Sequence, residues 1–391
     1  MGGGVSPLPP EARNGAPAPN FTPSEEPVGA PPTPTLPPSR GKGVSRRLAI
    51  ASGFALAACG PRANGQPVSG PVPPLKSLAP FPIGTCVQAR FLDDPAYAAL
   101  LTEHFSQLTA EWEMKMEYTV QDDGSFRFDR PDAIAGFARR HGLKLFGHTL
   151  IWYAQAPAAF VNLDESRTSF ARAYDNYITA FVGRYRGHAS GWDVINEPIK
   201  DDGSGLREHL WSRRLGEIDH MVRAFHVARA ADPDAVLLIN DYNLESNPAK
   251  LDQYQRLIDR LLNAGAPITG IGCQTHCNAD LPAGALTRTI NALARFGLKV
   301  HVSEMDVSIV RAGGWFVSRE EKEAAQARLY AEAMSAFAAL PEQQQFAFTI
   351  WGVRDPESWL VKEDRSDTPL LFDAGGRAKP AFLAVEAALR D

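Results

Sequence analysis

The chain has 391 residues, 44% of them hydrophobic, with a formal net charge of -5 and a sequence pI of about 6.0. This near-balanced charge argues against a nucleic-acid-binding protein, which usually carries a basic patch or a pI above about 9. The uncharged apolar run at residues 48–60 is too short to cross a bilayer as a helix, which argues against an integral membrane protein.

The first 80 residues differ in composition from the rest of the chain, because they hold 18 of the 31 prolines. Residues 1–44 show no hydrophobic periodicity, and such a segment cannot bury enough apolar surface to offset its conformational entropy. We expect residues 1–44 to be disordered, or to precede a later start of translation near Val44. Residues 61–80 are rich in Pro and Gly and are expected to be a linker.

Residues 45–60 have the build of a bacterial export signal. Arg46 and Arg47 precede an apolar run that ends in small residues, and the arginine pair is typical of the twin-arginine route. The run ends Leu-Ala-Ala-Cys, which resembles a lipobox, so Cys59 could carry a lipid anchor. A buried helix is the alternative, but Pro-rich stretches on both sides leave it nothing to pack against. We expect export to the periplasm, to the outer membrane or cell surface as a lipoprotein, or to the medium.

Residues 81–391 are expected to form one α/β domain, because short apolar runs alternate with amphipathic helical patterns. The expected strands are 83–87, 107–110, 143–149, 191–196, 236–240, 270–275, 300–303 and 345–350. The expected helices are 97–105, 132–140, 169–184, 210–230, 252–263, 286–296, 319–337 and 381–390. Apolar strands joined by helices indicate a parallel sheet buried on both faces. Eight such units predict a closed (β/α)8 TIM barrel, whereas the alternative, an open doubly wound sheet, often has a Gly-rich phosphate turn that is missing here.

Two glutamates stand at the ends of expected strands. Active sites of such barrels lie at the carboxyl ends of the strands. Glu197 follows strand 191–196 and Glu304 follows strand 300–303, so the two should face each other across the barrel mouth. Cleavage of a sugar acetal needs one carboxylic acid to protonate the leaving oxygen and one carboxylate to meet the cationic sugar. We therefore expect both glutamates to be catalytic.

The tryptophans near strand ends support the same interpretation. Trp152, Trp351 and Trp359 occur at or just past expected ends, where exposed indoles would stack on the apolar faces of sugar rings. Trp192 lies within a strand and is expected to be part of the core. Neither Trp211 nor Trp315 receives a role.

No metal and no organic cofactor are expected. Cys273, His276 and Cys277 are close in sequence, but no second cluster completes a tetrahedral set of ligands. Alternation along a strand would also point Cys273 and His276 to opposite faces. The pairing of Cys86, Cys273 and Cys277 stays open.

Six motifs in this order resemble those of glycoside hydrolase family 10, the retaining endo-β-1,4-xylanases: GHTLIWYAQAP, WDVINEP, NDYN, GIGCQTHC, VSEMDVS and TIWGVRDPESWL. The resemblance covers residues 81–383. It implies hydrolysis of internal bonds of xylan or xylo-oligosaccharides, with Glu197 as the acid/base and Glu304 as the nucleophile. It also implies that Asn196 holds the 2-hydroxyl of the reacting sugar.

The resemblance places further residues around the sugar chain. Those that would surround the reacting sugar are Lys115, His148, Trp152, Gln274, Trp351 and Trp359. Glu111 and Gln155 would reach the next sugar on the non-reducing side, and Tyr242 and Asn243 would face the leaving group. His276 can hydrogen-bond Glu304, and Asp306 can orient the imidazole, which favours an ionised Glu304.

Two positions depart from the family pattern. Trp112 stands where an asparagine is usual, so it could stack on a sugar or block the usual pose, and Tyr153 replaces the histidine that usually follows the motif tryptophan. A β-1,4-glucan or mixed-linkage glucan is the alternative substrate on the same site. A non-catalytic carbohydrate-binding lipoprotein is disfavoured, because Asn196 and both glutamates are present. We expect a monomer whose partner is its polysaccharide substrate.

Overall fold

The computed structural model describes residues 72–163, 166–313 and 318–390. The expected export signal, Cys59 and Trp315 lie outside the described residues. Residues 72–80, expected as the end of a linker, include the short helix η1 (Leu75–Ser77), whose Leu75 is fully buried in the core. In the part that the structure describes, no helix combines the length and the apolar character needed to span a membrane.

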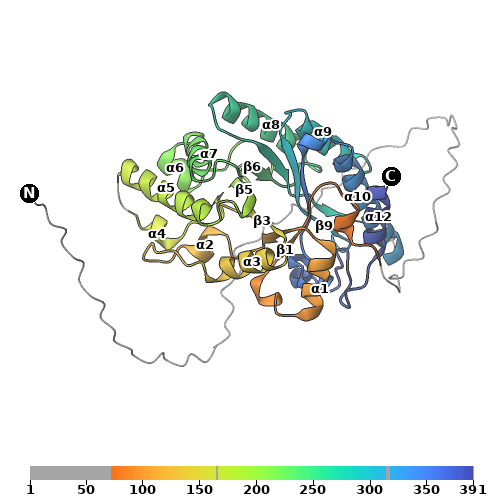
Figure 1. The fold of residues 1–391 in the computed structure, drawn as a ribbon. Helices are drawn as coiled ribbons and strands as arrows, with labels where there is room; N and C mark the ends of the chain where they lie inside the picture. The colour runs from red at the N-terminus through yellow and green to blue at the C-terminus, as the bar shows by residue number, and fades with distance from the viewer. Residues whose placement is uncertain (1–71, 164–165, 314–317, 391) are drawn as a thin grey trace, which may run out of the picture. The chain divides into compact units, whose positions relative to one another are not determined.

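Eight parallel strands among the described residues close into a barrel (Figure 1). They are β1 (Ile83–Val87), β2 (Gln107–Ala110), β3 (Lys144–Gly147), β5 (Ala189–Asn196), β6 (Val236–Asp241), β7 (Gly270–Cys273), β9 (Lys299–Ser308) and β10 (Gln345–Ile350). Each pairs with the next, and β10 pairs with both β9 and β1, which completes the ring. Two short strands, β4 (Ile151–Trp152) and β8 (His276–Asn278), pair with β5 and β9. This confirms the predicted (β/α)8 TIM barrel.

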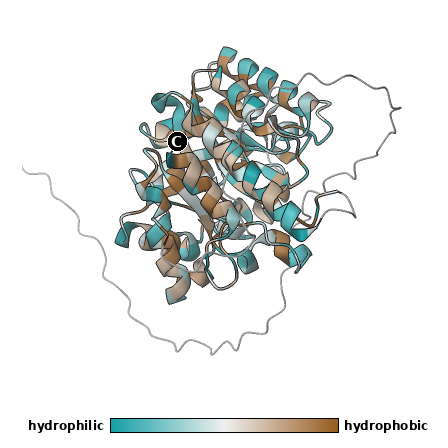
Figure 2. Ribbon diagram, turned by 90° about the vertical axis from the view of Figure 1, so that its right-hand side faces the viewer, coloured by the Kyte–Doolittle hydropathy of each residue, from teal (hydrophilic) through white to brown (hydrophobic). Residues whose placement is uncertain are grey.

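Helices follow the barrel strands and surround them. The longer ones are α1 (Pro95–His104), α3 (Asp129–Arg140), α5 (Arg167–Arg184), α7 (Asp219–Ala231), α8 (Pro248–Asn263), α9 (Ala285–Ala294), α10 (Arg319–Ala338) and α12 (Pro380–Arg390). The shorter ones are α2 (Met116–Thr119), α4 (Ala158–Val161), α6 (Leu210–Leu215) and α11 (Trp359–Glu363), with one-turn helices η2 (Ala89–Phe91), η3 (Glu342–Gln344) and η4 (Asp355–Glu357). Figure 2 shows both hydrophilic and hydrophobic residues on the helices around the barrel.

The single helix expected over residues 210–230 is wrong, because the chain breaks into α6 and α7. Gly216 ends α6 with a φ of 104°, a conformation that residues other than glycine rarely adopt. The prediction for Trp192 is confirmed, since its ring is fully buried between β5 and α5 against Phe181. Gly147 on the neighbouring strand makes room for it, because a Cβ there would lie 2.0 Å from the indole.

His301 is a titratable group buried inside the fold. Its Nε2 lies 2.8 Å from Thr349 Oγ1, and its ring packs against Phe146 and Phe346. Burial lowers the pKa of His301 to about 3. An unfolded chain would bind that proton near pH 6.5, so between these two values the unfolded state holds more protons than the folded state. We therefore expect His301 to reduce stability as the pH falls through this window.

The variant His301→Gln tests this expectation, because it keeps a hydrogen-bonding group beside Thr349 and removes the titrating ring. The slope of unfolding free energy against pH, measured by denaturant titration between about pH 6 and about pH 4, should fall by about 1.4 kcal/mol per pH unit. The matched control is His188→Gln, a replacement of the same kind at an exposed position. Equal slopes for His301→Gln and wild type would contradict the expectation.

Candidate active site

Glu197 lies at the carboxyl end of β5, where the chain leaves the barrel. Its φ is 56°, in the left-handed region that residues other than glycine rarely adopt. Its N–H donates to the Asn240 carbonyl oxygen at 2.8 Å. Its carboxyl group accepts hydrogen bonds from Trp152 Nε1 at 2.8 Å, from Gln274 Nε2 at 3.0 Å and from Asn196 Nδ2 at 3.2 Å. Backbone and side chain are therefore both held at the barrel mouth.

Glu304 lies within β9 and not after it. The strand expected over residues 300–303 continues further because β8 pairs with it, His276 opposite Asp306. Glu304 Oε1 accepts a hydrogen bond from Asn240 Nδ2 at 2.8 Å, and Glu304 Oε2 lies 3.5 Å from His276 Nε2. His276 Nδ1 lies 3.0 Å from Asp306 Oδ1. The structure thus brings together the three residues expected to act as a chain.

Two amide groups connect the two glutamates. Asn240 in β6 donates from Nδ2 to Asn196 Oδ1 at 3.0 Å and to Glu304 Oε1 at 2.8 Å, and its own Oδ1 accepts from Ser303 Oγ at 2.8 Å. Asn196, its register partner across β5 and β6, donates to Glu197. Sequence reasoning assigns no role to Asn240. The sequence feature that could have indicated it is an amide residue near the carboxyl end of an otherwise apolar strand.

The two glutamates have opposite electrostatic environments. Burial raises the pKa of Glu197 above its ordinary value. Burial would also raise the pKa of Glu304, but the cationic forms of His148 and His276 outweigh it and lower that pKa to about 2. Burial disfavours a charge on His276, yet Asp306 and Glu304 outweigh this effect and raise its pKa to about 10. Glu304 is therefore ionised at neutral pH, whereas Glu197 keeps its proton to a higher pH than an exposed glutamate.

Asp193 holds His148 beside Glu304. His148 Nδ1 lies 2.8 Å from Asp193 Oδ2 and 4.0 Å from Glu304 Oε1. Burial raises the pKa of Asp193 to about 6, because its effect outweighs the hydrogen bond with His148, which lowers the pKa. One potential ligand atom from each of His148, Asp193 and Glu304 lies within 4.8 Å of the other two, a spacing that could bind a cation. Each group already has a partner within the protein. Sequence reasoning missed Asp193, for which the signal was an acidic residue inside an apolar strand.

The cysteines that are close to His276 in sequence do not share a site with it. The Cys273 and Cys277 sulfurs point toward the buried carboxyl group of Glu245, at 4.0 and 3.8 Å, whereas the imidazole faces Glu304. Cys273 and Cys277 are free thiols.

Two of the tryptophans expected to be exposed are buried. Trp152 is 9% exposed and Trp351 is 5% exposed, which corrects the expectation. The polar edge of an indole explains why a site tryptophan can be buried, because its N–H can meet a carboxyl group. Trp152 donates to Glu197, and Trp359 Nε1 donates to Asp306 Oδ2 at 2.7 Å. These indoles therefore also help to position the carboxyl groups.

The side expected to bind the next sugar of the chain carries buried polar atoms. Lys115 Nζ lies over the rings of Trp112 and Trp152, 4.4 and 4.8 Å from their centroids. Within the described residues, Glu111 Oε1 and Gln155 Nε2 are buried and have no hydrogen-bond partner. Buried polar atoms are nearly always hydrogen-bonded. These two atoms are consequently suited to the hydroxyl groups of a ligand.

Tyr242 and Asn243, expected to face the leaving group, follow β6. The Tyr242 hydroxyl contacts Asp201 and accepts a hydrogen bond from Arg207 Nη2 at 2.8 Å. Lys250 Nζ lies 3.4 Å from the centroid of the Tyr242 ring. Asn243 has a φ of 57°, so a second residue at this end of the barrel has the left-handed conformation. Sequence reasoning gives no role to Arg207, Asp201 or Lys250.

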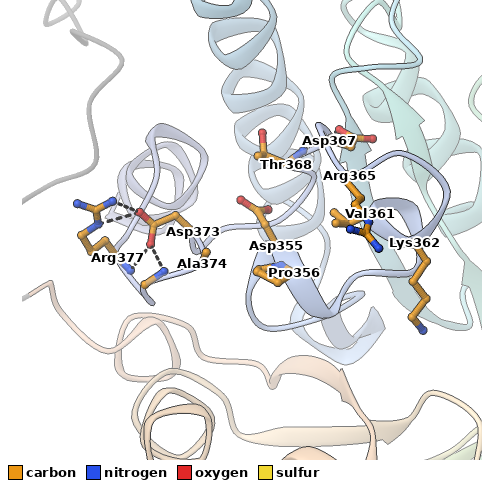
Figure 3. A pocket seen from close by; sticks show the side chains of 11 residues that line it. Asp355, Pro356, Val361, Lys362, Arg365, Asp367, Thr368, Asp373, Ala374 and Arg377 are labelled. Carbon is orange, nitrogen blue, oxygen red and sulfur yellow. Dashed lines mark hydrogen bonds and ion pairs between the residues drawn. The ribbon is translucent and has the colours of Figure 1, made fainter. Parts of the chain in front are cut away.

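A separate cavity of about 690 Å³ lies among residues that follow β10 (Figure 3). Neither Glu197 nor Glu304 lines it. Its acidic groups are already paired within the protein: Asp373 with Arg377, Asp355 with Lys379, and Asp367 with Ser308. We therefore place the reaction at the barrel mouth and not in this cavity.

Comparison with known proteins identifies the family of this chain. A model of glycosyl hydrolase family 10 matches residues 76–388. The chain belongs to glycosyl hydrolase family 10. This family 10 domain therefore takes up nearly all of the part of the chain that the structure describes.

Relatives of this family 10 chain include proteins that it covers almost fully and much larger proteins. The beta-1,4-xylanase of Dictyoglomus thermophilum is 36% identical, over 80% of this chain and 90% of that protein. Exoglucanase XynX of Acetivibrio thermocellus is 35% identical over 81% of this chain, and the chain spans under a third of the length of this and other curated relatives. A mutant of the xylanase TsXylA of Thermoanaerobacterium saccharolyticum, solved in complex with xylotetraose, matches with a TM-score of 0.73 and 35% identity, over 80% of this chain and 98% of that one.

Proposed function

We propose that this chain is a retaining endo-β-1,4-xylanase that hydrolyses internal β-1,4 bonds of xylan or xylo-oligosaccharides. The observation that carries the proposal is the division between two buried glutamates in one hydrogen-bonded network. Glu304 has a pKa lowered to about 2, and Glu197 has a pKa raised by burial. A nucleophile must be ionised and a general acid must be protonated, so this division supports the assigned roles.

The reaction follows from these roles in two steps. Glu304 attacks the anomeric carbon while Glu197 protonates the departing glycosidic oxygen, which gives a covalent glycosyl-enzyme. A water molecule then attacks the same carbon, gives its proton to Glu197 and releases Glu304. Two displacements at one carbon retain the anomeric configuration. The carboxyl groups of retaining enzymes lie about 5 to 5.5 Å apart.

The first step itself prepares Glu197 for the second. The negative charge of Glu304 contributes to the raised pKa of Glu197. When Glu304 becomes an ester, this charge disappears and the pKa of Glu197 falls. The lower pKa favours the carboxylate form of Glu197, which can then accept a proton from water. The same side chain thus acts as an acid and then as a base.

The choice of xylan over glucan rests on the relatives' names. Several similar proteins carry the name xylanase, and one solved relative holds xylotetraose, but one is named an exoglucanase. A β-1,4-glucan or mixed-linkage glucan is therefore the second candidate substrate. The two sugars differ at C5, where only glucose carries a hydroxymethyl group.

The test compares hydrolysis of aryl β-xylobioside with that of aryl β-cellobioside by the full chain. We expect a higher kcat/KM for the xylobioside, and NMR of fresh product should show the β-anomer before mutarotation. A preference for the cellobioside would favour the glucan alternative. An α-anomer as first product would refute the retaining mechanism, and cleavage of neither substrate would refute the proposed function.

Trp112 is expected to stack on the second sugar of the glycone. Its ring lies beside Tyr118, with Lys115 Nζ 4.4 Å and Lys362 Nζ 5.8 Å from its centroid, and it is only partly buried. Aromatic stacking contributes about 0.5–1.5 kcal/mol. The variant Trp112→Ala should therefore lower kcat/KM for aryl β-xylobioside by about 2- to 10-fold, with a smaller loss for aryl β-xyloside, which lacks the second sugar. Trp112→Phe keeps a ring and is the control. A gain of activity in Trp112→Ala would mean that the indole blocks the subsite.

We also propose that residues 45–60 direct export and that Cys59 is the acylation site, since the cationic start, apolar run and lipobox-like end occur in the expected order. The mass of the mature protein from a bacterial host tests this. Processing at Cys59 with an added diacylglycerol supports it, and a mature chain that retains residues 45–60 contradicts it.

A further inference from the structure

Arg207 reaches back to the proposed acid/base from a hairpin that begins directly after it. The chain leaves Glu197, turns, and returns through an antiparallel bridge between Ile199 and Leu206. The Arg207 N–H donates to the Pro198 carbonyl oxygen at 2.9 Å. Arg207 Nε donates to the Glu197 carbonyl oxygen at 3.1 Å. The hairpin therefore closes on the residue from which it started.

The guanidinium group is fixed on several sides. Its Nη2 lies 2.7 Å from Asp201 Oδ1 and 2.8 Å from the Tyr242 hydroxyl. Its carbon lies 4.2 Å from the centroid of the Tyr153 ring, so the group stacks on an aromatic face. Only 13% of the Arg207 side chain is exposed. Tyr153, which departs from the family pattern, thus forms one wall of the space that holds Arg207.

The backbone of Glu197 needs such support. Its left-handed conformation is unfavourable for a residue with a side chain and persists only where the surroundings hold it. Two backbone hydrogen bonds do so: the N–H of Glu197 donates to Asn240, and its carbonyl oxygen accepts from Arg207. This conformation aims the carboxyl group at Trp152 and Gln274, across the mouth from Glu304.

We propose that Arg207 is a positioning residue for acid catalysis: by holding the carbonyl oxygen of Glu197, it keeps the carboxyl group in line with the departing oxygen. This inference rests on the proposed function. Arg207 acts through Glu197 and not on the nucleophile. Its loss should accordingly affect only substrates whose leaving group needs a proton.

The experiment compares Arg207→Met and Arg207→Lys with wild type on two aryl β-xylobiosides. Phenol leaves poorly and needs protonation, whereas 2,4-dinitrophenol leaves as a stable anion. We expect Arg207→Met to lower kcat/KM for the phenyl substrate by about 10- to 100-fold, since a displacement of about 1 Å can cost that much, and for the dinitrophenyl substrate by less than about 3-fold. The kcat/KM of Arg207→Lys for the phenyl substrate should lie between those of wild type and Arg207→Met. An ammonium group cannot hydrogen-bond the Glu197 carbonyl oxygen, Asp201 and Tyr242 in one plane.

The matched control is Arg213→Met, at a side chain that is 56% exposed and pairs only with Glu208 at 3.7 Å among the contacts of the described residues. It should leave both rates unchanged. A misfolded fraction lowers the measured rate on both substrates by the same factor. The ratio of the two rates is therefore unaffected by misfolding. Equal losses on both substrates, or no loss on either, would overturn the inference. Wild type that cleaves neither substrate would instead refute the proposed function.

Discussion

Replacing Glu304 by glycine should reduce kcat for aryl β-xylobiosides by at least about 10⁴-fold, the scale on which loss of a nucleophile acts. Without this carboxylate no glycosyl-enzyme can form, and the remaining groups only bind and protonate the substrate. Initial rates with the dinitrophenyl substrate measure the loss. Retention of more than about one hundredth of the wild-type rate would contradict the role of Glu304.

Sodium azide should restore turnover in Glu304→Gly, because the vacated space beside His148 and His276 can hold a small anion. Azide attacks the anomeric carbon from the side that Glu304 occupied, the bond to the aryl oxygen breaks, and dinitrophenolate departs. The product is α-xylobiosyl azide, identified by NMR. Glu304→Gln is the control, because its side chain fills the space and should prevent the rescue. A β-azide from Glu304→Gly would place the nucleophile elsewhere.

Replacing Glu197 by alanine should lower kcat/KM for phenyl β-xylobioside by about 10²- to 10⁴-fold, the usual contribution of general acid catalysis. The rate of the first step should fall much less with the dinitrophenyl substrate. The glycosyl-enzyme should then accumulate, because no base activates water for its hydrolysis. Stopped-flow measurement should show a burst of dinitrophenolate. Azide should then yield β-xylobiosyl azide, the opposite anomer to that from Glu304→Gly. Equal losses on both aryl substrates would contradict the role of Glu197.

The pH profile supplies a second measure of Glu197. It reacts in the protonated form, and burial raises its pKa above the ordinary value of 4.5. Activity should therefore persist above pH 4.5 and decline as the pH rises through the raised pKa. The acid limb belongs to Glu304 and should lie near pH 2. In Glu197→Ala the alkaline limb for the dinitrophenyl substrate should disappear.

The barrel could be predicted from the sequence because its strands are buried on both faces and thus read as continuous apolar runs. Glu197 and Glu304 could be found because a carboxylate directly after such a run stands out. Strand ends were less well predicted, and β9 continues past residue 303 because β8 pairs with it, a tertiary contact that local pattern does not show. Gly216 could have indicated the break between α6 and α7, since it interrupts an otherwise helical pattern.

The residues that sequence reasoning missed act through geometry that spacing does not show. Asn240 and Asp193 are polar residues within apolar strands, and only the barrel brings their side chains to Glu304 and His148. Arg207 lies ten residues after Glu197 on a hairpin whose closure depends on its own hydrogen bonds. The burial of Trp152 follows from its bond to Glu197. In each case the partner lies far away in sequence or across a turn.

The pairing of Asn196 with Asn240 has a practical consequence for altering this protein. Two amides on adjacent strands link the glutamates, because Asn240 donates to Glu304 and to Asn196, and Asn196 donates to Glu197. The spacing of the glutamates therefore depends on strand register and hardly on the connecting segments. Side chains expected to reach the next sugar of the chain, such as Glu111 and Gln155, lie outside this pairing. Exchanging them with those of other barrels of this kind should change which polysaccharides are cut while leaving the bond-breaking apparatus intact. The fold separates what is recognised from how it is cleaved.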